Sequence, residues 1–153
     1  NVTDEELVGV LVHEMGHIMD TGVLNGSVWA FESAFKDGSN PVYADDASLD
    51  FYRISFENET MLRVNAMNLD FVSGYAMTDP FEDFAETYAY YVLHNKAFKA
   101  KVATSTALYA KYRFMKYRVF NGIEFDTGSE TANTLARPWD VTVLPYDLNE
   151  FLQ

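Results

Sequence analysis

The pattern of apolar and polar positions predicts three helices separated by a long middle segment. The first helix is expected from Thr3 to about Asp20. Thr3 and Glu6 have the spacing of a capping box, in which each side chain bonds the backbone of the other residue. Gly22 and Gly26 follow, and glycine commonly ends a helix. The first helix should therefore occupy most of the first twenty residues.

Two further helices are expected in the second half of the chain. Asp79 followed by Pro80 is a capping residue before a first-turn proline, and the helix that they open extends to about residue 95. Apolar residues at helical spacing predict another helix over about residues 104–120, which Asn121 and Gly122 end. The sequence therefore favours a mainly helical α+β fold.

The segments between these helices carry weaker patterns. Residues 27–35 are rich in aromatic side chains, residues 37–46 have a loop-like composition, and residues 51–56 alternate weakly, as in a strand. The tail from about residue 124 contains Pro138 and Pro145 and little periodicity, so we expect it to follow the surface. No internal repeat is present, and we expect one domain over residues 1–153.

Composition narrows the possible partners. The 153 residues are 48% hydrophobic and carry a net charge of −12, which fits a globular domain and repels nucleic-acid phosphates and anionic membranes. We therefore expect no nucleic-acid partner, and no apolar run reaches the roughly 20 residues that span a bilayer. With no cysteine, thiolate metal sites are excluded. Because the chain starts at Asn1 next to its best motif, we interpret it as part of a longer precursor whose N-terminal part is a further partner.

The first helix contains the pattern His-Glu-x-x-His at residues 13–17. His13 and His17 are four residues apart, so their imidazoles lie on one helix face and can share a metal ion. Glu14 projects beside that pair, where it can reach a metal-bound water without ligating the ion. Zinc lowers the pKa of such a water towards about 7, and the carboxylate takes its proton as a carbonyl is attacked. The motif predicts a Zn²⁺-dependent hydrolase acting on a peptide or protein substrate.

A third protein ligand is required, and acidic residues of the second helix are the best candidates. Asp20 and Val23 stand where the metzincin class has glycine and histidine, which excludes that class. Glu82 and Glu86 are four residues apart on one face, so one can ligate the metal and the other can accept a hydrogen bond from a ligand imidazole. His94 lies about 18 Å along the same helix from Glu82 and cannot serve the same ion. We interpret it as a helix-end histidine near the negative pole of the dipole.

A helix bearing the motif and a second helix bearing a glutamate ligand make the plan of the gluzincin metallopeptidases. Ser73-Gly74-Tyr75 followed by Glu82-Asp83-Phe84-Ala85-Glu86 resembles the catalytic domain of anthrax lethal factor and the bacterial Pro-Pro endopeptidases. The resemblance covers about a third of the chain. It implies a zincin-like fold, Glu82 as the third ligand, Glu86 as the acid that orients a ligand histidine, and Tyr75 as an auxiliary catalytic residue that assists the oxyanion or leaving group. The sheet that precedes the motif helix in that family has no room in this chain.

Two acidic groups offer further sites. Asp20 follows His13 and His17 on one stripe and can orient a ligand imidazole, although a solvated carboxylate at a helix end is the more common arrangement. Asp45, Asp46 and Asp50 are acidic but lack the spacing of a calcium loop, which favours a hydrated loop over calcium binding.

The sequence as a whole therefore predicts a zinc endopeptidase, and a bacterial, secreted setting fits the resemblance. The alternative is a catalytically inactive zinc-binding domain that serves as a structural or protein-binding module.

Overall fold

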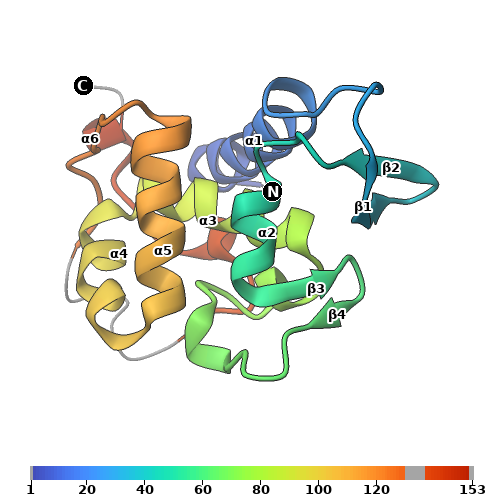
Figure 1. Ribbon diagram of the computed structural model, residues 1–153. Coiled ribbons are helices and arrows are strands. Elements are labelled where there is room, and N and C mark those ends of the chain that lie inside the picture. Colours follow the sequence, from blue (N-terminus) through green and yellow to red (C-terminus); the bar gives the residue numbers. More distant parts are fainter. Residues whose placement is uncertain (1, 130–136, 152–153) are drawn as a thin grey trace.

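The computed structural model describes residues 2–129 and 137–151, which form a small α+β fold dominated by helices, with two two-stranded sheets (Figure 1). The α-helices are α1 (Asp4–His17), α2 (Leu49–Ser55), α3 (Pro80–Leu93), α4 (Asn95–Lys101), α5 (Thr106–Phe114) and α6 (Leu148–Phe151). The strands are β1 (Glu32–Asp37), β2 (Asn40–Tyr43), β3 (Phe56–Asn58) and β4 (Met61–Leu62). Short π or 3-10 turns are η1 (Ile18–Val23), η2 (Asn68–Asp70), η3 (Tyr75–Met77), η4 (Val102–Thr104), η5 (Met115–Val119) and η6 (Val141–Val143).

Local signals place α1 as the sequence predicts. The Thr3 hydroxyl accepts the Glu6 backbone N–H at 3.2 Å, and the Glu6 carboxylate accepts the Thr3 N–H at 2.9 Å, so the capping box is formed. The first turn also carries three acidic residues, Asp4, Glu5 and Glu6. Their negative charges stabilise the helix by interacting with the positive end of its dipole. The helix continues as the π-helical turn η1 to Val23, slightly beyond the expected end.

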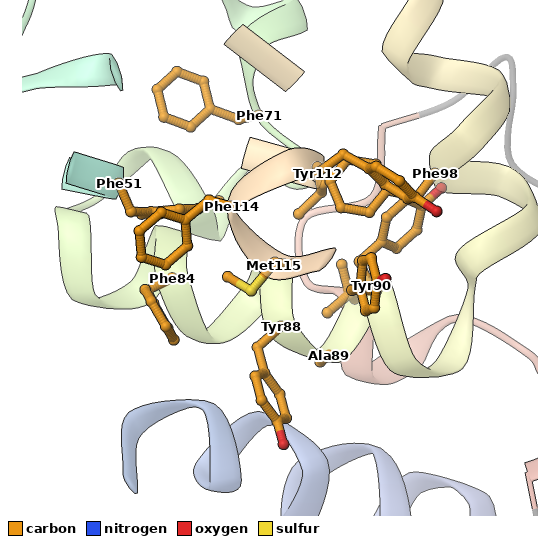
Figure 2. Packing of buried hydrophobic residues seen from close by; sticks show 14 of the residues in the cluster. Phe51, Phe71, Phe84, Tyr88, Ala89, Tyr90, Phe98, Tyr112, Phe114 and Met115 are labelled. Carbon is orange, nitrogen blue, oxygen red and sulfur yellow. The ribbon is translucent and has the colours of Figure 1, made fainter. Parts of the chain in front are cut away.

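Helix α3 is the centre of the hydrophobic core. Asp79 caps it by accepting the backbone N–H groups of Phe81 and Glu82, as expected for the residue before Pro80. From Asp83 to Leu93 every residue of the helix is buried. Figure 2 shows its side chains pointing to several neighbours, with Tyr88 toward α1 and Phe84 beside the aromatic rings of α2 and α5. A helix that is buried on all sides holds its polar residues in fixed positions.

A buried ion pair joins α3 to α5. The Lys111 ammonium lies 2.7 Å from the Asp83 carboxylate, and both side chains are completely buried. The ammonium also donates to the Asp70 carbonyl at 2.8 Å and lies 3.9 Å from the centroid of the Phe71 ring. Lys111 is therefore part of the core despite its charge.

The middle segment contradicts the sequence-based expectation in two places. Residues 37–46 include the turn and second strand of an antiparallel hairpin, β1–β2, whose register runs from Glu32 opposite Tyr43 to Asp37 opposite Asn40. Only Phe35 of β1 is buried, so the strand lacks the alternation that would reveal it. Residues 51–56 are largely the helix α2 and not a strand, because its buried positions recur at helical spacing and pack against α3 and α5.

The region after α3 also differs from the prediction. A separate helix, α4, follows directly after His94, where no element was expected. The tail was expected to follow the surface, but Val141 is buried and η6 packs against α1 and α3. Among the described residues, no helix is long and apolar enough to cross a bilayer.

Candidate metal centre

The close packing of α1 on α3 brings the two predicted ligand helices together. They run antiparallel, with His13 opposite Glu86 and His17 opposite Glu82. Gly16, inside the motif, permits this approach because a Cβ atom at that position would lie 2.8 Å from the Cα of Ala85. The motif therefore supplies both histidines of the candidate centre and the small residue that lets the other helix reach them.

Three side chains converge between these helices. The Glu82 Oε2 atom lies 3.2 Å from His13 Nε2 and 3.5 Å from His17 Nε2. The three residues form a group that can hold a metal ion, since one ligand atom from each lies within 4.8 Å of the others. The structure thus brings together the three residues that the sequence analysis offers as metal ligands.

The donor set and its spacing fit zinc. Ligand atoms at tetrahedral angles and about 2.0–2.2 Å from a zinc ion are separated by about 3.3–3.6 Å. The separations of 3.2 and 3.5 Å between Glu82 Oε2 and the two ring nitrogens are close to these values. Glu82 Oε2 is buried and has no hydrogen-bond partner among the described residues, although two ring nitrogens face it. A cation bound by this oxygen and by the two imidazoles would compensate the cost of burying the carboxylate without a hydrogen bond.

Glu86 fixes the orientation of His13. Its Oε1 lies 2.9 Å from His13 Nδ1, which leaves Nε2 pointing toward Glu82 and His17. The other carboxylate oxygen of Glu86 accepts the backbone N–H of Val141 at 2.9 Å. Both oxygens of this fully buried carboxylate are therefore used, and the ring that they hold presents a single nitrogen to a metal.

The two glutamates dominate the electrostatics of the centre. Burial alone would lower the pKa of His13, but the Glu82 and Glu86 carboxylates raise it to about 9. The Glu82 carboxylate also raises the pKa of His17. Conversely, although burial opposes it, the two histidines hold the pKa of Glu82 well below its usual range. This concentration of negative charge around two imidazoles favours a divalent cation.

Tyr75 lies at the edge of the same centre. Its ring stacks near the His13 ring, with centroids 6.2 Å apart and planes 20° from parallel. Burial and the neighbouring Glu82 carboxylate raise the pKa of the Tyr75 hydroxyl to about 12, so it is protonated and able to donate a hydrogen bond at neutral pH. Glu14 is exposed on α1, directly after His13, and is free to face a substrate.

The tail supplies contacts that the sequence did not reveal. The carbonyls of Pro138 and Trp139 accept the backbone N–H groups of Gly74 and Tyr75 at 2.8 and 2.6 Å, which ties the tail to the segment that carries Tyr75. Gly74 has no space for a side chain, because a Cβ atom there would lie 2.5 Å from the Trp139 ring. With the Val141 N–H on Glu86, residues 138–141 therefore contact both the segment that carries Tyr75 and the carboxylate that orients His13.

The remaining candidates lie outside the centre. Asp20 is buried and accepts the Tyr52 hydroxyl at 2.7 Å, so the expected solvated carboxylate is wrong, and among the described contacts it bonds no ligand histidine. Burial raises the pKa of Asp20 to about 7. His94 ends α3 as expected, but it is buried, and burial lowers its pKa to about 4, so it carries no charge to interact with the helix dipole at neutral pH.

The acidic loop carries structural hydrogen bonds. Asp45 accepts the Ser27 backbone N–H, and Asp46 accepts those of Gly26 and Ser48. Asp50 is exposed on α2 and lies 3.8 Å from Arg118. Within the described part of the chain, these three carboxylates do not belong to a group that can hold a metal ion.

Comparison with known proteins identifies the chain at the level of a family. Residues 3–150 match the family model Peptidase_Mx, described as "Putative zinc-binding metallo-peptidase". No curated protein and no solved structure matches the chain. The matched range contains both ligand helices and the tail that packs on them.

Proposed function

Because the chain belongs to the Peptidase_Mx family of zinc-binding metallo-peptidases, we propose that it is a zinc-dependent endopeptidase of the gluzincin type with a zincin-like fold. The observation that carries the proposal is the convergence of His13 Nε2, His17 Nε2 and Glu82 Oε2 beside an exposed Glu14. Three ligands leave one coordination position open, as in catalytic zinc sites, whereas structural sites are usually closed by four protein ligands.

The reaction assigned to this centre is the hydrolysis of a peptide bond. Zinc held by the three ligands would polarise the substrate carbonyl and lower the pKa of a bound water towards about 7. Glu14 accepts the proton of the attacking water and passes it to the leaving amine. Its position one residue after His13 places it next to the ligands without making it one of them.

Tyr75 and Glu86 are assigned supporting roles. The protonated Tyr75 hydroxyl donates a hydrogen bond to the oxyanion that develops as the carbonyl is attacked. Glu86 keeps the His13 ring in the orientation that ligation requires. The stacking of Tyr75 near His13 and its seven-residue spacing from Glu82 support the resemblance to the lethal factor and Pro-Pro endopeptidase catalytic domains.

Zinc analysis and cleavage assays test the proposal together. Purified protein should carry about one zinc per chain and cleave members of a diverse peptide library. Glu14→Gln should keep zinc and fold but lose turnover, because the amide preserves shape and removes the base. Glu82→Ala should lose zinc, whereas His94→Ala should retain it.

These measurements distinguish a zinc peptidase from a non-catalytic zinc-binding domain and test the ligand assignment. Turnover by Glu14→Gln at the parent rate, with matched zinc content, would contradict the catalytic role of Glu14. Zinc binding without cleavage of any peptide would identify a non-catalytic metal-binding module. Zinc retained by Glu82→Ala and lost by His94→Ala would overturn the ligand assignment.

A further inference from the structure

A half-enclosed cavity of about 280 Å³ lies beside the metal centre. Its walls come from η1 and the loop after it, the β1–β2 hairpin, the loop that carries Asp46, helix α2 and the first turn of α3. Pockets that enclose a whole small-molecule ligand occupy roughly 300–1,000 Å³, so this cavity has the size for one long side chain.

The position of the cavity relates it to the scissile bond. Thr21, which lines it, is four residues after His17, and Phe81, which also lines it, directly precedes Glu82. Because α1 and α3 are antiparallel, both helices lead from the candidate metal centre toward the cavity, with a rise of about 5.4 Å per helical turn. A peptide bound with its reacting carbonyl at the centre can therefore place a neighbouring side chain in the cavity.

The inner wall of the cavity is apolar. Pro41 and Val42 of the hairpin line it together with Phe81 and Tyr52, whose rings pack edge to face with centroids 5.2 Å apart. The Tyr52 hydroxyl is already engaged with Asp20. These surfaces suit the methylene stem of a long side chain, and aromatic faces also attract a cation.

The polar part of the cavity carries negative charge. Asp37 and Asp46 line it, and no lysine or arginine does so among the described residues. Within the same part of the chain, neither carboxylate forms an ion pair with a basic side chain. Asp46 is half-buried and accepts the backbone N–H groups of Gly26 and Ser48, so its position is fixed. A half-buried carboxylate without a counter-charge gains stability when a cation enters.

We infer that this cavity binds the side chain of a lysine or arginine next to the scissile bond, and that Asp46 and Asp37 select it. The inference rests on the proposed function and names its substrate class, a peptide with a basic residue close to the cleaved bond. The stem of the basic side chain lies along the apolar wall, and its charged end meets the two carboxylates.

Matched peptides and charge-neutral variants test this inference. The zinc-loaded protein is assayed with pairs of peptides that differ only by lysine or uncharged norleucine at each position near the cleaved bond. At one position kcat/KM should favour lysine by about ten- to a hundredfold, the range typical of a hydrogen bond to a charged group. Asp46→Asn should remove most of this preference, and Asp37→Asn, at an exposed position, should reduce it about twofold to fivefold. The preference is the ratio of kcat/KM for the two peptides of a pair, so a general loss of activity in a variant does not change it.

Glu32→Gln is the matched control, because Glu32 is an exposed carboxylate of the same strand that does not line the cavity. It should leave the lysine preference unchanged. If Asp46→Asn fails to fold because of the lost Gly26 contact, Asp37→Asn and the charge reversal Asp37→Lys decide the question. Efficient cleavage without a lysine preference, or with one that these variants do not change, would overturn the inference and leave the proposed function intact.

A different outcome would count against the proposed function itself. If neither the parent nor Glu14→Gln cleaves any peptide, binding of the same peptide pairs to both zinc-loaded proteins decides the role of the cavity. Tighter binding of the lysine peptide that Asp37→Asn abolishes would support the cavity as a cation site. Equal binding of the two peptides would overturn it.

Discussion

The two ends of α3 place histidines in opposite electrostatic surroundings. At the N-terminal end, His13 lies between Glu82 and Glu86, which overcome the effect of burial and raise its pKa to about 9. At the C-terminal end, His94 lies among aromatic rings such as that of Tyr90, and burial lowers its pKa to about 4. Both histidines are nearly inaccessible to solvent.

The contrast shows that burial does not by itself make a metal site. Burial disfavours any charged form, so a histidine in an apolar setting stays neutral and attracts no cation. The N-terminal end differs because its first turns carry acidic residues, which the positive end of the helix dipole also stabilises. The negative charge that favours a cation at this end therefore comes from Glu82 and Glu86, and four predictions test this difference.

The largest expected effect concerns Asp83, the carboxylate near the N-terminal end of α3 that pairs with Lys111 in the core. Lys111→Ala should leave Asp83 as an uncompensated charge in the core and lower the free energy of unfolding by about 3–5 kcal/mol. Urea denaturation followed by circular dichroism measures this change. Lys99→Ala is the matched control, since Lys99 forms an exposed pair with Glu124 and its removal should cost less than about 1 kcal/mol.

A double variant sharpens the same test. Asp83→Leu combined with Lys111→Met should recover most of the stability, because a well-packed apolar pair avoids the cost of removing two charges from water. A loss of less than 1 kcal/mol in Lys111→Ala would show that Asp83 is compensated by other groups, and the two ends of the helix would then differ less than the structure indicates.

The second prediction concerns the hydroxyl at the edge of the metal centre. Tyr75→Phe should lower kcat by about 10²- to 10³-fold, or roughly 3–4 kcal/mol, and change KM less, because the lost hydrogen bond forms mainly in the transition state. Zinc content and thermal stability should barely change. Steady-state kinetics measures the effect, with Tyr109→Phe, at an exposed position of α5, as the control. An active Phe variant would assign Tyr75 a structural role.

The third prediction concerns the backbone contact between the tail and Glu86. Val141→Pro removes the N–H that Glu86 accepts, and it suits the backbone because Val141 is the first residue of η6 and Asp140 before it is extended. Zinc affinity should fall by about ten- to a hundredfold, as expected for a group that supports a ligand. Val141→Ala keeps the N–H and should bind zinc as the parent does.

Competition with a chromophoric chelator measures both affinities. Equal zinc affinity in the proline and alanine variants would show that the tail does not support the centre. A loss in both would assign the effect to packing of the valine side chain.

The smallest prediction concerns the C-terminal end of α3. Because the pKa of His94 is lowered on folding, the unfolded chain binds more protons between about pH 6.5 and 4, so the stability that His94 contributes is lost as pH falls through this range. Between pH 7 and 5 the parent should lose about 2 kcal/mol more than His94→Phe. Urea denaturation at the two pH values, with a chelator present, measures the difference. Parallel losses would show that His94 keeps its ordinary pKa.

The sequence predicted the two ligand helices because their signals are local. The capping box at Thr3 and Glu6, and Asp79 before Pro80, fix the helix starts through contacts between near neighbours. The motif spacing then places His13 on the buried face. The positions of the candidate ligands on their helices therefore follow from helical periodicity. The distances between the ligand atoms come from the structure.

Other parts of the fold depend on contacts that leave little trace in the sequence. Strand β1 buries only Phe35, so its pattern resembles a loop. The contact between Val141 and Glu86 spans 55 positions and uses a backbone N–H, which every residue except proline has. Residues that support the centre through their backbone cannot be recognised by side-chain type.

The absence of a side chain at Gly16 has a consequence for the choice of ion. The gap between α1 and α3 sets the separation of His17 and Glu82, and a methyl group at position 16 would press directly on the Ala85 backbone. A wider gap would lengthen the ligand distances toward the roughly 2.3–2.6 Å of calcium and away from the roughly 2.0–2.2 Å of zinc. The glycine in the middle of the motif therefore keeps the two helices close enough for the candidate ligand atoms to suit a small ion such as zinc.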